Sequence, residues 1–244
     1  MLLSSSPKTH FQEWVDRKLS IARGLRQGEL GGSYYDAALI VSALIGCLSA
    51  FAWPRSDERE RNDRRRFVEA WTKLSPPNLG AHRISMPLFI ADLESAGKTE
   101  IAKRLRAKHR AFSPGYASLM ITGDDVDLSA ENVKETAPEL DTKEIRGFSY
   151  GSVFYTEIRS GLVHEYQLGR NAEAHSMARE AEGPSYDNLF EHGSVPSEDG
   201  EVRRTIHFPP HWLEPLVRSI AEKVEPLMER GGLPRPEKWW LNGG

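Results

Sequence analysis

The chain has 244 residues, of which 39% are hydrophobic and 27% charged, so it is long enough to bury a substantial core. This composition excludes collagen-like and wholly disordered chains, and the single cysteine, Cys47, excludes a disulfide framework and a cysteine-rich zinc module. The net charge of −3 argues against coating nucleic acid by bulk electrostatics, so any nucleic-acid site must be local. The first residues lack the pattern of a signal peptide, and we expect a cytoplasmic protein.

The first part of the chain is expected to be helical. Residues 8–28 carry apolar side chains at a loose helical period. A second helix is predicted over 33–53, up to Pro54, and it contains an uncharged run of 17 residues from Ala37 to Trp53. A membrane span needs about 20 apolar residues. A buried core helix is therefore favoured over a membrane anchor, and we expect no membrane association.

The middle of the chain is predicted to hold shorter elements. A strongly charged third helix is expected to end before Pro76, and two helices broken near Gly97 are expected over 85–111. Residues 114–122 are a weak strand candidate. The acidic stretch 123–141 is predicted to be a surface excursion.

The last 100 residues are predicted to contain two long helices and a small hairpin. Residues 145–168 carry an apolar stripe at helical period, and a last helix is expected from about 209 to 230. Short strands within 185–208 are expected to pair as a β-hairpin. The predicted fold class is mostly α, a single helical domain over 1–244 with a small β-hairpin insertion. The C-terminal tail, which contains two tryptophans, is expected either to dock on this domain or to fray.

Two local patterns are similar to ligand-binding motifs, but each lacks a residue or a backbone geometry that the motif requires. Residues 96–99 are similar to the end of a phosphate-binding P-loop, but the earlier position that must be glycine is Asp92. We interpret Gly97 as the end of a helix instead. His207 and His211 have a metal-ligand spacing, but the two prolines between them prevent a regular helical turn. The sequence predicts no metal and no cofactor.

Arginine and histidine side chains remain as candidate chemistry. Metal-free RNA cleavage needs a group that moves protons near neutral pH, which histidine does, and a fixed cation that holds the phosphate, which arginine does. Pairs with arginine five residues before histidine are Arg104–His109, Arg159–His164 and Arg170–His175. The first lies in a charge run and the third in polar sequence. Only Arg159 and His164 lie inside a long amphipathic helix that could hold both groups rigidly.

The octapeptide 159–166 resembles the signature motif of the HEPN superfamily: arginine, a polar residue, a variable residue, two apolar residues, histidine, one residue, tyrosine. Ser160 stands where the family usually has asparagine. The resemblance implies a helical bundle that forms a homodimer with a composite site, and a metal-independent endoribonuclease acting as a toxin, in antiviral defence or in RNA processing. An antitoxin protein is a further implied partner. Other members have lost cleavage, so the alternative is a non-catalytic RNA- or nucleotide-binding or protein-interaction module.

The resemblance also implies roles for individual residues. Arg159 would bind the scissile phosphate, and His164 would be the general base or acid as the ribose 2′-hydroxyl attacks. Ser160 and Tyr166 would support the site. Arg170 and His175 are the second-choice pair, because they lack the apolar residues before the histidine.

The geometry of a regular helix opposes a site built from one copy, because residues five apart point about 140° away from each other. Gly161 could allow a local bend, or two such helices could meet about a two-fold axis. The bland interpretation is an arginine in a surface salt bridge and a histidine satisfied at a helix end.

Two basic segments could add contacts to RNA. Acidic residues interleave with the arginines of 59–66, so we expect a salt-bridged surface there. Residues 98–110 are more purely cationic and are expected to face RNA.

Overall fold

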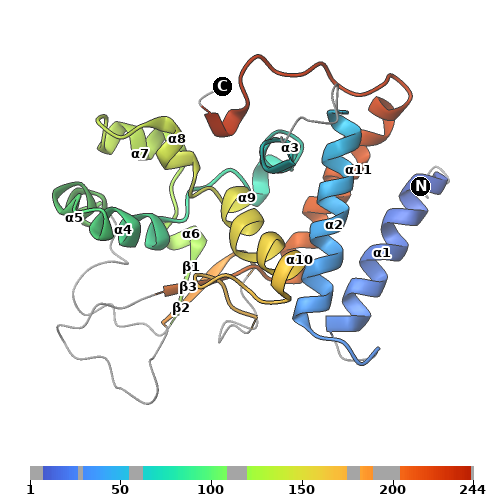
Figure 1. Ribbon diagram of the computed structural model, residues 1–244, viewed down its shortest axis with the longest axis horizontal. Coiled ribbons are helices and arrows are strands. Elements are labelled where there is room, and N and C mark those ends of the chain that lie inside the picture. The colour runs from blue at the N-terminus through green and yellow to red at the C-terminus, as the bar shows by residue number, and fades with distance from the viewer. Residues whose placement is uncertain are drawn as a thin grey trace, which may run out of the picture.

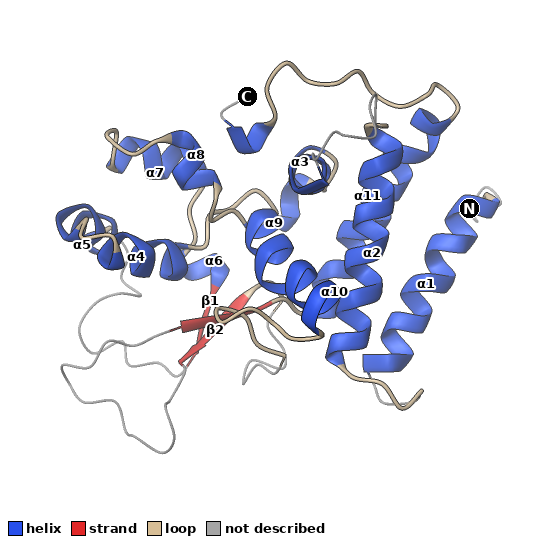
Figure 2. Ribbon diagram, in the orientation of Figure 1, coloured by secondary structure: helices blue, strands red, loops and turns tan. Residues whose placement is uncertain are grey.

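The computed structural model describes residues 8–26, 30–54, 63–108, 120–174, 182–188 and 204–242. In these ranges the chain is mostly α-helical with a small sheet, as predicted (Figures 1 and 2). The longer helices are α1 (His10–Arg26), α2 (Tyr34–Ala52), α3 (Asp63–Lys73), α4 (Met86–Ser95), α5 (Thr99–Ala107) and α11 (Pro210–Met228). The shorter helices are α6 (Gly123–Val126), α7 (Ala130–Thr136), α8 (Thr142–Arg146), α9 (Tyr150–Val153) and α10 (Gly161–Glu165). The strands are β1 (Met120–Thr122), β2 (Ser185–Asn188) and β3 (Arg204–His207).

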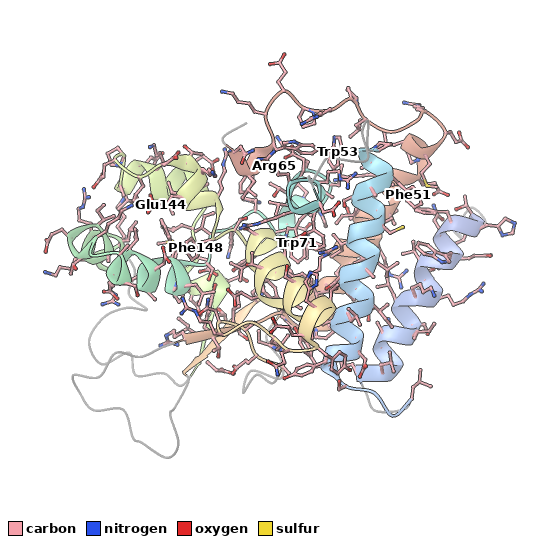
Figure 3. The ribbon with its side chains drawn as sticks, in the orientation of Figure 1. Phe51, Trp53, Arg65, Trp71, Glu144 and Phe148 are labelled. Atoms are coloured by element: carbon pink, nitrogen blue, oxygen red, sulfur yellow. The ribbon has the colours of Figure 1, made fainter. Side chains whose placement is uncertain are left out.

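The main core forms around α2, which packs against α1, α3, α11 and the helical segment 150–165 (Figure 1). Ile45 and Leu48 of α2 are fully buried, which confirms the prediction of a core helix. By length and composition alone, α2 could also span a membrane, and half of its most apolar window is buried in the fold. Trp71 of α3 lies at the centre of the core, where its ring contacts Phe154 and Trp212 (Figure 3).

A second apolar cluster lies between α4, α5, α7 and α8. Gly97 has φ +77° and separates α4 from α5, as predicted for a helix end. The prediction of a surface excursion over 123–141 is wrong. Val133 and Leu140 are buried in this cluster, because its apolar residues recur at helical period and face α4 and α5. Phe148 joins this cluster to the main core and contacts Phe89 of α4 (Figure 3).

The sheet contains three antiparallel strands in the order β1-β2-β3, with Tyr186 paired to Ile121 on one side and to Ile206 on the other. The β2–β3 pair confirms the predicted pairing. The weak strand candidate is confirmed for 120–122, and its earlier part lies outside the described residues. Ala172 adds one more bridge to Ile206.

The C-terminal tail docks on the body, crossing from the end of α11 to α3 and α8 (Figure 1). Trp240 donates its backbone N–H to the Glu69 carboxylate at 2.6 Å and accepts from Arg146 at 2.6 Å. The Arg146 guanidinium also lies 4.5 Å from the centre of the Trp240 ring. These contacts select docking over fraying.

Candidate functional site

The predicted motif lies on a helical segment that changes its winding. The predicted helix over 145–168 is shorter than expected, because α8 ends at Arg146 and a new helix starts only at Tyr150. Between α9 and α10, residues Phe154–Ser160 form a π-helical turn. Such turns are rare and are frequently found at functional sites. The sequence pattern gave no sign of it, because Phe154 and Ile158, both buried, also suit an α-helix.

Arg159 lies at the end of this π-helical turn. Its guanidinium carbon is 4.7 Å from the centre of the Tyr155 ring, a cation–π contact. It also borders α2, where a Cβ added at Gly46 would be 3.9 Å from the Arg159 Nε atom. Among the described residues no carboxylate pairs with Arg159, so the bland interpretation of a salt-bridged arginine is wrong.

Arg64 of α3 is a second guanidinium on this side of the motif segment, within electrostatic range of Tyr155. Its Nη2 donates to the Ser152 hydroxyl at 2.6 Å, and burial lowers its pKa while the nearby Tyr155 hydroxyl raises it. Its Nε is buried and has no acceptor in the described part of the chain. The salt-bridged surface expected over 59–66 lies partly outside the described residues, which here begin at Asp63. Within them, Arg66 pairs with Asp63 but is buried, and Arg64 donates to Ser152 instead of a carboxylate.

The basic segment 98–110 was expected to be more purely cationic, but most of its described cations are paired with carboxylates. Over 98–108, Lys98 donates to Glu144 at 2.5 Å (Glu144 is labelled in Figure 3). The remaining pairs are Lys103–Glu100, Arg104–Glu139 and Arg106–Glu94. This surface is therefore largely neutralised by its own carboxylates, which its sequence neighbours did not reveal because two of the partners come from 139–144. Residues 109 and 110 lie outside the described ranges.

His164 is exposed on α10, and neither it nor Ser160 has a hydrogen bond within the described ranges. Within these ranges Ser160 therefore does not hydrogen-bond the imidazole, and its supporting role stays a prediction. The alternative interpretation, in which the imidazole of His164 is hydrogen-bonded at a helix end, is therefore wrong for the described residues.

Tyr166 ends α10 in the left-handed conformation, with φ +52° and ψ +36°. Its hydroxyl donates to Asp36 Oδ1 at 2.5 Å, and its ring lies edge-on to Tyr35 at 6.1 Å. The hydrogen bond from Tyr166, followed by those from Ser33, lowers the pKa of Asp36. Tyr166 thus positions the end of the motif helix against the start of α2.

Gly161 does not bend the helix, because its φ of −62° and ψ of −48° are ordinary helical values. Glycine is needed there for close approach, since a Cβ would lie 2.2 Å from the carbonyl oxygen of Gln167. The loop after the helix folds back along it, and Glu157 accepts hydrogen bonds from the Asn171 side chain at 3.0 Å and backbone at 3.2 Å. Of the second-choice pair, Arg170 is exposed on this loop and His175 lies outside the described residues.

A buried carboxyl that the sequence did not single out supports the start of the motif helix. Asp127 accepts from the hydroxyls of Tyr150 and Tyr186, each at 2.5 Å, and from the Met86 N–H at 2.8 Å. Burial raises the Asp127 pKa to about 7, and these hydrogen bonds oppose the rise. Because Asp127 is buried at a junction of α4, α6, α9 and β2, it has a structural role.

Comparison with known proteins identifies no family for this chain. No protein-family model, curated protein or solved structure matches the chain. Within the described ranges, no group of three His, Cys, Asp or Glu residues is placed to hold a metal ion. The Arg159 guanidinium lies against the Tyr155 ring, Arg64 is within electrostatic range of Tyr155, and the exposed His164 imidazole is on the same helical segment as Arg159. These groups suit binding and proton transfer at a phosphodiester.

Proposed function

We propose that the protein is a metal-independent endoribonuclease of HEPN type. The observation that carries the proposal is the state of two side chains: Arg159 is held by Tyr155 without a carboxylate, and His164 is exposed without a partner in the described ranges. A guanidinium without a counter-charge is ready to receive a phosphate, and an unpaired imidazole is ready to exchange a proton.

In this mechanism RNA supplies its own nucleophile. The 2′-oxygen forms a bond to phosphorus as His164, acting as general base, removes the hydroxyl proton. The bond from phosphorus to the 5′-oxygen breaks, and that oxygen takes a proton from a general acid. The products are a 2′,3′-cyclic phosphate and a free 5′-hydroxyl. Arg159 stabilises the extra charge on the phosphoryl oxygens, assisted by Arg64.

A homodimer completes the proposed site. Residues five apart on a helix diverge by about 140°, and Gly161 supplies no bend. A two-fold axis beside α10 would place Arg159 of one protomer beside the partner's His164. We also propose a cytoplasmic toxin or antiviral effector controlled by an antitoxin protein, for which growth arrest on expression, relieved by His164→Ala, is the first test.

The decisive experiment incubates labelled RNA with the full chain in EDTA. We expect wild-type protein to cleave, leaving cyclic phosphate ends, and His164→Ala and Arg159→Ala to lose at least a hundredfold of the rate. His10→Ala and Arg17→Ala, which alter exposed residues of α1, are matched controls and should cleave normally. Cleavage that persists in His164→Ala, or that EDTA abolishes, would contradict the proposal.

A second candidate is a non-catalytic RNA-binding module. It is favoured by Ser160, which replaces the usual asparagine and makes no hydrogen bond to the imidazole in the described ranges. Intact RNA bound equally by wild type and His164→Ala would select this candidate.

A further inference from the structure

Tyr155 lies against the proposed phosphate-binding arginine and has no role in the mechanism so far. The Arg159 guanidinium carbon is 4.7 Å from the centre of the Tyr155 ring. The two residues are four positions apart within the π-helical turn Phe154–Ser160, so both side chains leave the segment on one face. A phosphate that accepts hydrogen bonds from the Arg159 guanidinium therefore lies beside the Tyr155 ring.

The ring of Tyr155 is packed in place, whereas its hydroxyl is not engaged by the described residues. Phe67 of α3 lies edge-on to the ring, with 5.3 Å between the ring centres and 71° between the ring planes. Tyr155 is half-buried, and its hydroxyl makes no hydrogen bond within the described ranges. A buried tyrosine hydroxyl usually has a hydrogen-bond partner, so this one is available to a ligand.

Two guanidinium groups can offset negative charge that develops on the phenolic oxygen. Burial lowers the pKa of Arg64 and the interaction with Tyr155 raises it, which places the Arg64 charge within electrostatic range of that oxygen. Arg64 donates to the neutral hydroxyl of Ser152 at 2.6 Å, and within the described ranges no carboxylate pairs with Arg159. Neither charge is therefore neutralised by a described carboxylate, and both favour an anion between them.

The proposed cleavage still needs a general acid for the leaving 5′-oxygen. In-line displacement places the attacking and leaving oxygens on opposite sides of the phosphorus. In the proposed dimer the partner's His164 acts on the attacking side, so the acid must come from the protomer that supplies Arg159. That protomer's own His164 diverges from Arg159 by about 140°.

The neighbours of Arg159 leave one suitable proton donor in the described part of the chain. Guanidinium groups do not release their protons in proteins, and the aliphatic hydroxyl of Ser160 is a much weaker acid than a phenol. A phenol carries its proton at neutral pH and can give it to a far more basic alkoxide. The phenol that contacts Arg159 is Tyr155.

We propose that Tyr155 is the general acid of the cleavage reaction and protonates the 5′-oxygen as its bond to phosphorus breaks. This inference rests on the proposed ribonuclease function and names a further catalytic residue for it. The phenolic O–H bond breaks, and the proton passes to the 5′-oxygen directly or through one water molecule. The electron pair that stays on the phenolate oxygen is stabilised by Arg159 and Arg64. A proton then moves through solvent from the His164 imidazolium to the phenolate, which restores both groups for the next turnover.

The test compares two leaving groups on one RNA. The substrate is the RNA segment that the wild-type protein cleaves in EDTA, synthesised with oxygen or with sulfur at the 5′ position of the scissile linkage. A thiolate leaves without a proton, because thiols are far more acidic than alcohols. We expect Tyr155→Phe, which keeps the ring against Arg159, to lose about a hundredfold of the rate on the oxygen substrate and less than about tenfold on the sulfur substrate. His164→Ala should lose about a hundredfold or more on both, because the 2′-hydroxyl proton must still be removed.

The outcomes separate this role from the function on which it rests. Tyr35→Phe removes the hydroxyl of another half-buried tyrosine, and this matched control should cleave both substrates at the wild-type rate. Tyr155→Phe that is as active as wild type on the oxygen substrate, or is slowed equally on both substrates, would overturn the role of Tyr155 and leave the ribonuclease intact. If the wild-type protein cleaves no RNA, the ribonuclease is rejected together with its acid. Thermal unfolding checks that each variant is folded.

Discussion

Replacing Gly161 with alanine tests whether the loop after the motif helix is packed as tightly as described. Glycine inside a helix is normally less stable than alanine by about 1 kcal/mol, so helix propensity alone predicts a gain. At Gly161 the added Cβ would lie 2.2 Å from the Gln167 carbonyl oxygen, which belongs to the backbone and cannot rotate away. Overpacking of this kind costs about 1–3 kcal/mol. A separation of 2.2 Å from a backbone atom is far inside contact distance, so the upper end of this range applies. After the propensity gain is subtracted, we expect Gly161→Ala to lose about 2 kcal/mol of unfolding free energy.

Gly46 of α2 provides the matched control. It is also helical, but its added Cβ would lie 3.9 Å from Arg159 Nε, an ordinary contact distance. Gly46→Ala should therefore be neutral or gain up to about 1 kcal/mol. Urea unfolding followed by tryptophan fluorescence measures both variants. A Gly161→Ala protein as stable as the wild type would refute the close approach of the loop, and with it our explanation of this glycine.

Three further predictions concern charge and hydrogen bonding. The fold favours protonated Asp127. Its contribution to the unfolding free energy is therefore fully present below pH 3.8, the ordinary pKa, and is lost as pH rises through about 7. The contribution lost over this range is about 4 kcal/mol. Urea unfolding from pH 4 to 8 should show the fall up to about pH 7 in wild type and a flatter profile in Asp127→Asn, and equal profiles would contradict the assignment. Tyr166→Phe removes the hydrogen bond to Asp36 and should raise that pKa toward its ordinary value in an NMR titration, whereas no shift would disprove the contact. Arg64→Ala should weaken RNA binding and reduce the slope of log affinity against log salt by about 1, while Arg106→Ala, which removes a paired cation, should change it less.

Helices with a clear local signal were predictable from the sequence. The break at Gly97, the uncharged run of α2 and the apolar face of α11 depend on neighbours within a few residues, and the structure has all three. Residues 123–141 were misread because their acidic composition outweighed the helical spacing of the apolar residues that reach the second core. The pairing of β1 with β2 joins residues more than 60 positions apart, so no local pattern could establish it.

The candidate site divides in the same way. Arg159 and His164 were found from their spacing on an amphipathic segment. Their surroundings could not be predicted, because Tyr155 interacts with Arg159 of its own segment and with Arg64 of α3, and the fold alone brings α3 to the π-helical turn. The pairing of the cations in 98–108 and the burial of Asp127 likewise depend on partners brought together only by the tertiary fold.

The docked tail has a consequence for synthesis of the protein on the ribosome. Burial raises the pKa of Glu69, and the tail's N–H at Trp240, followed by the charges of Lys73 and Arg146, lowers it. Trp240 follows Glu69 by 171 residues, so α3 leaves the ribosome long before this donor does. Until the tail arrives, only the charges of Lys73 and Arg146 offset the burial of this carboxylate, and the tail should dock on α3 and α8 late in folding.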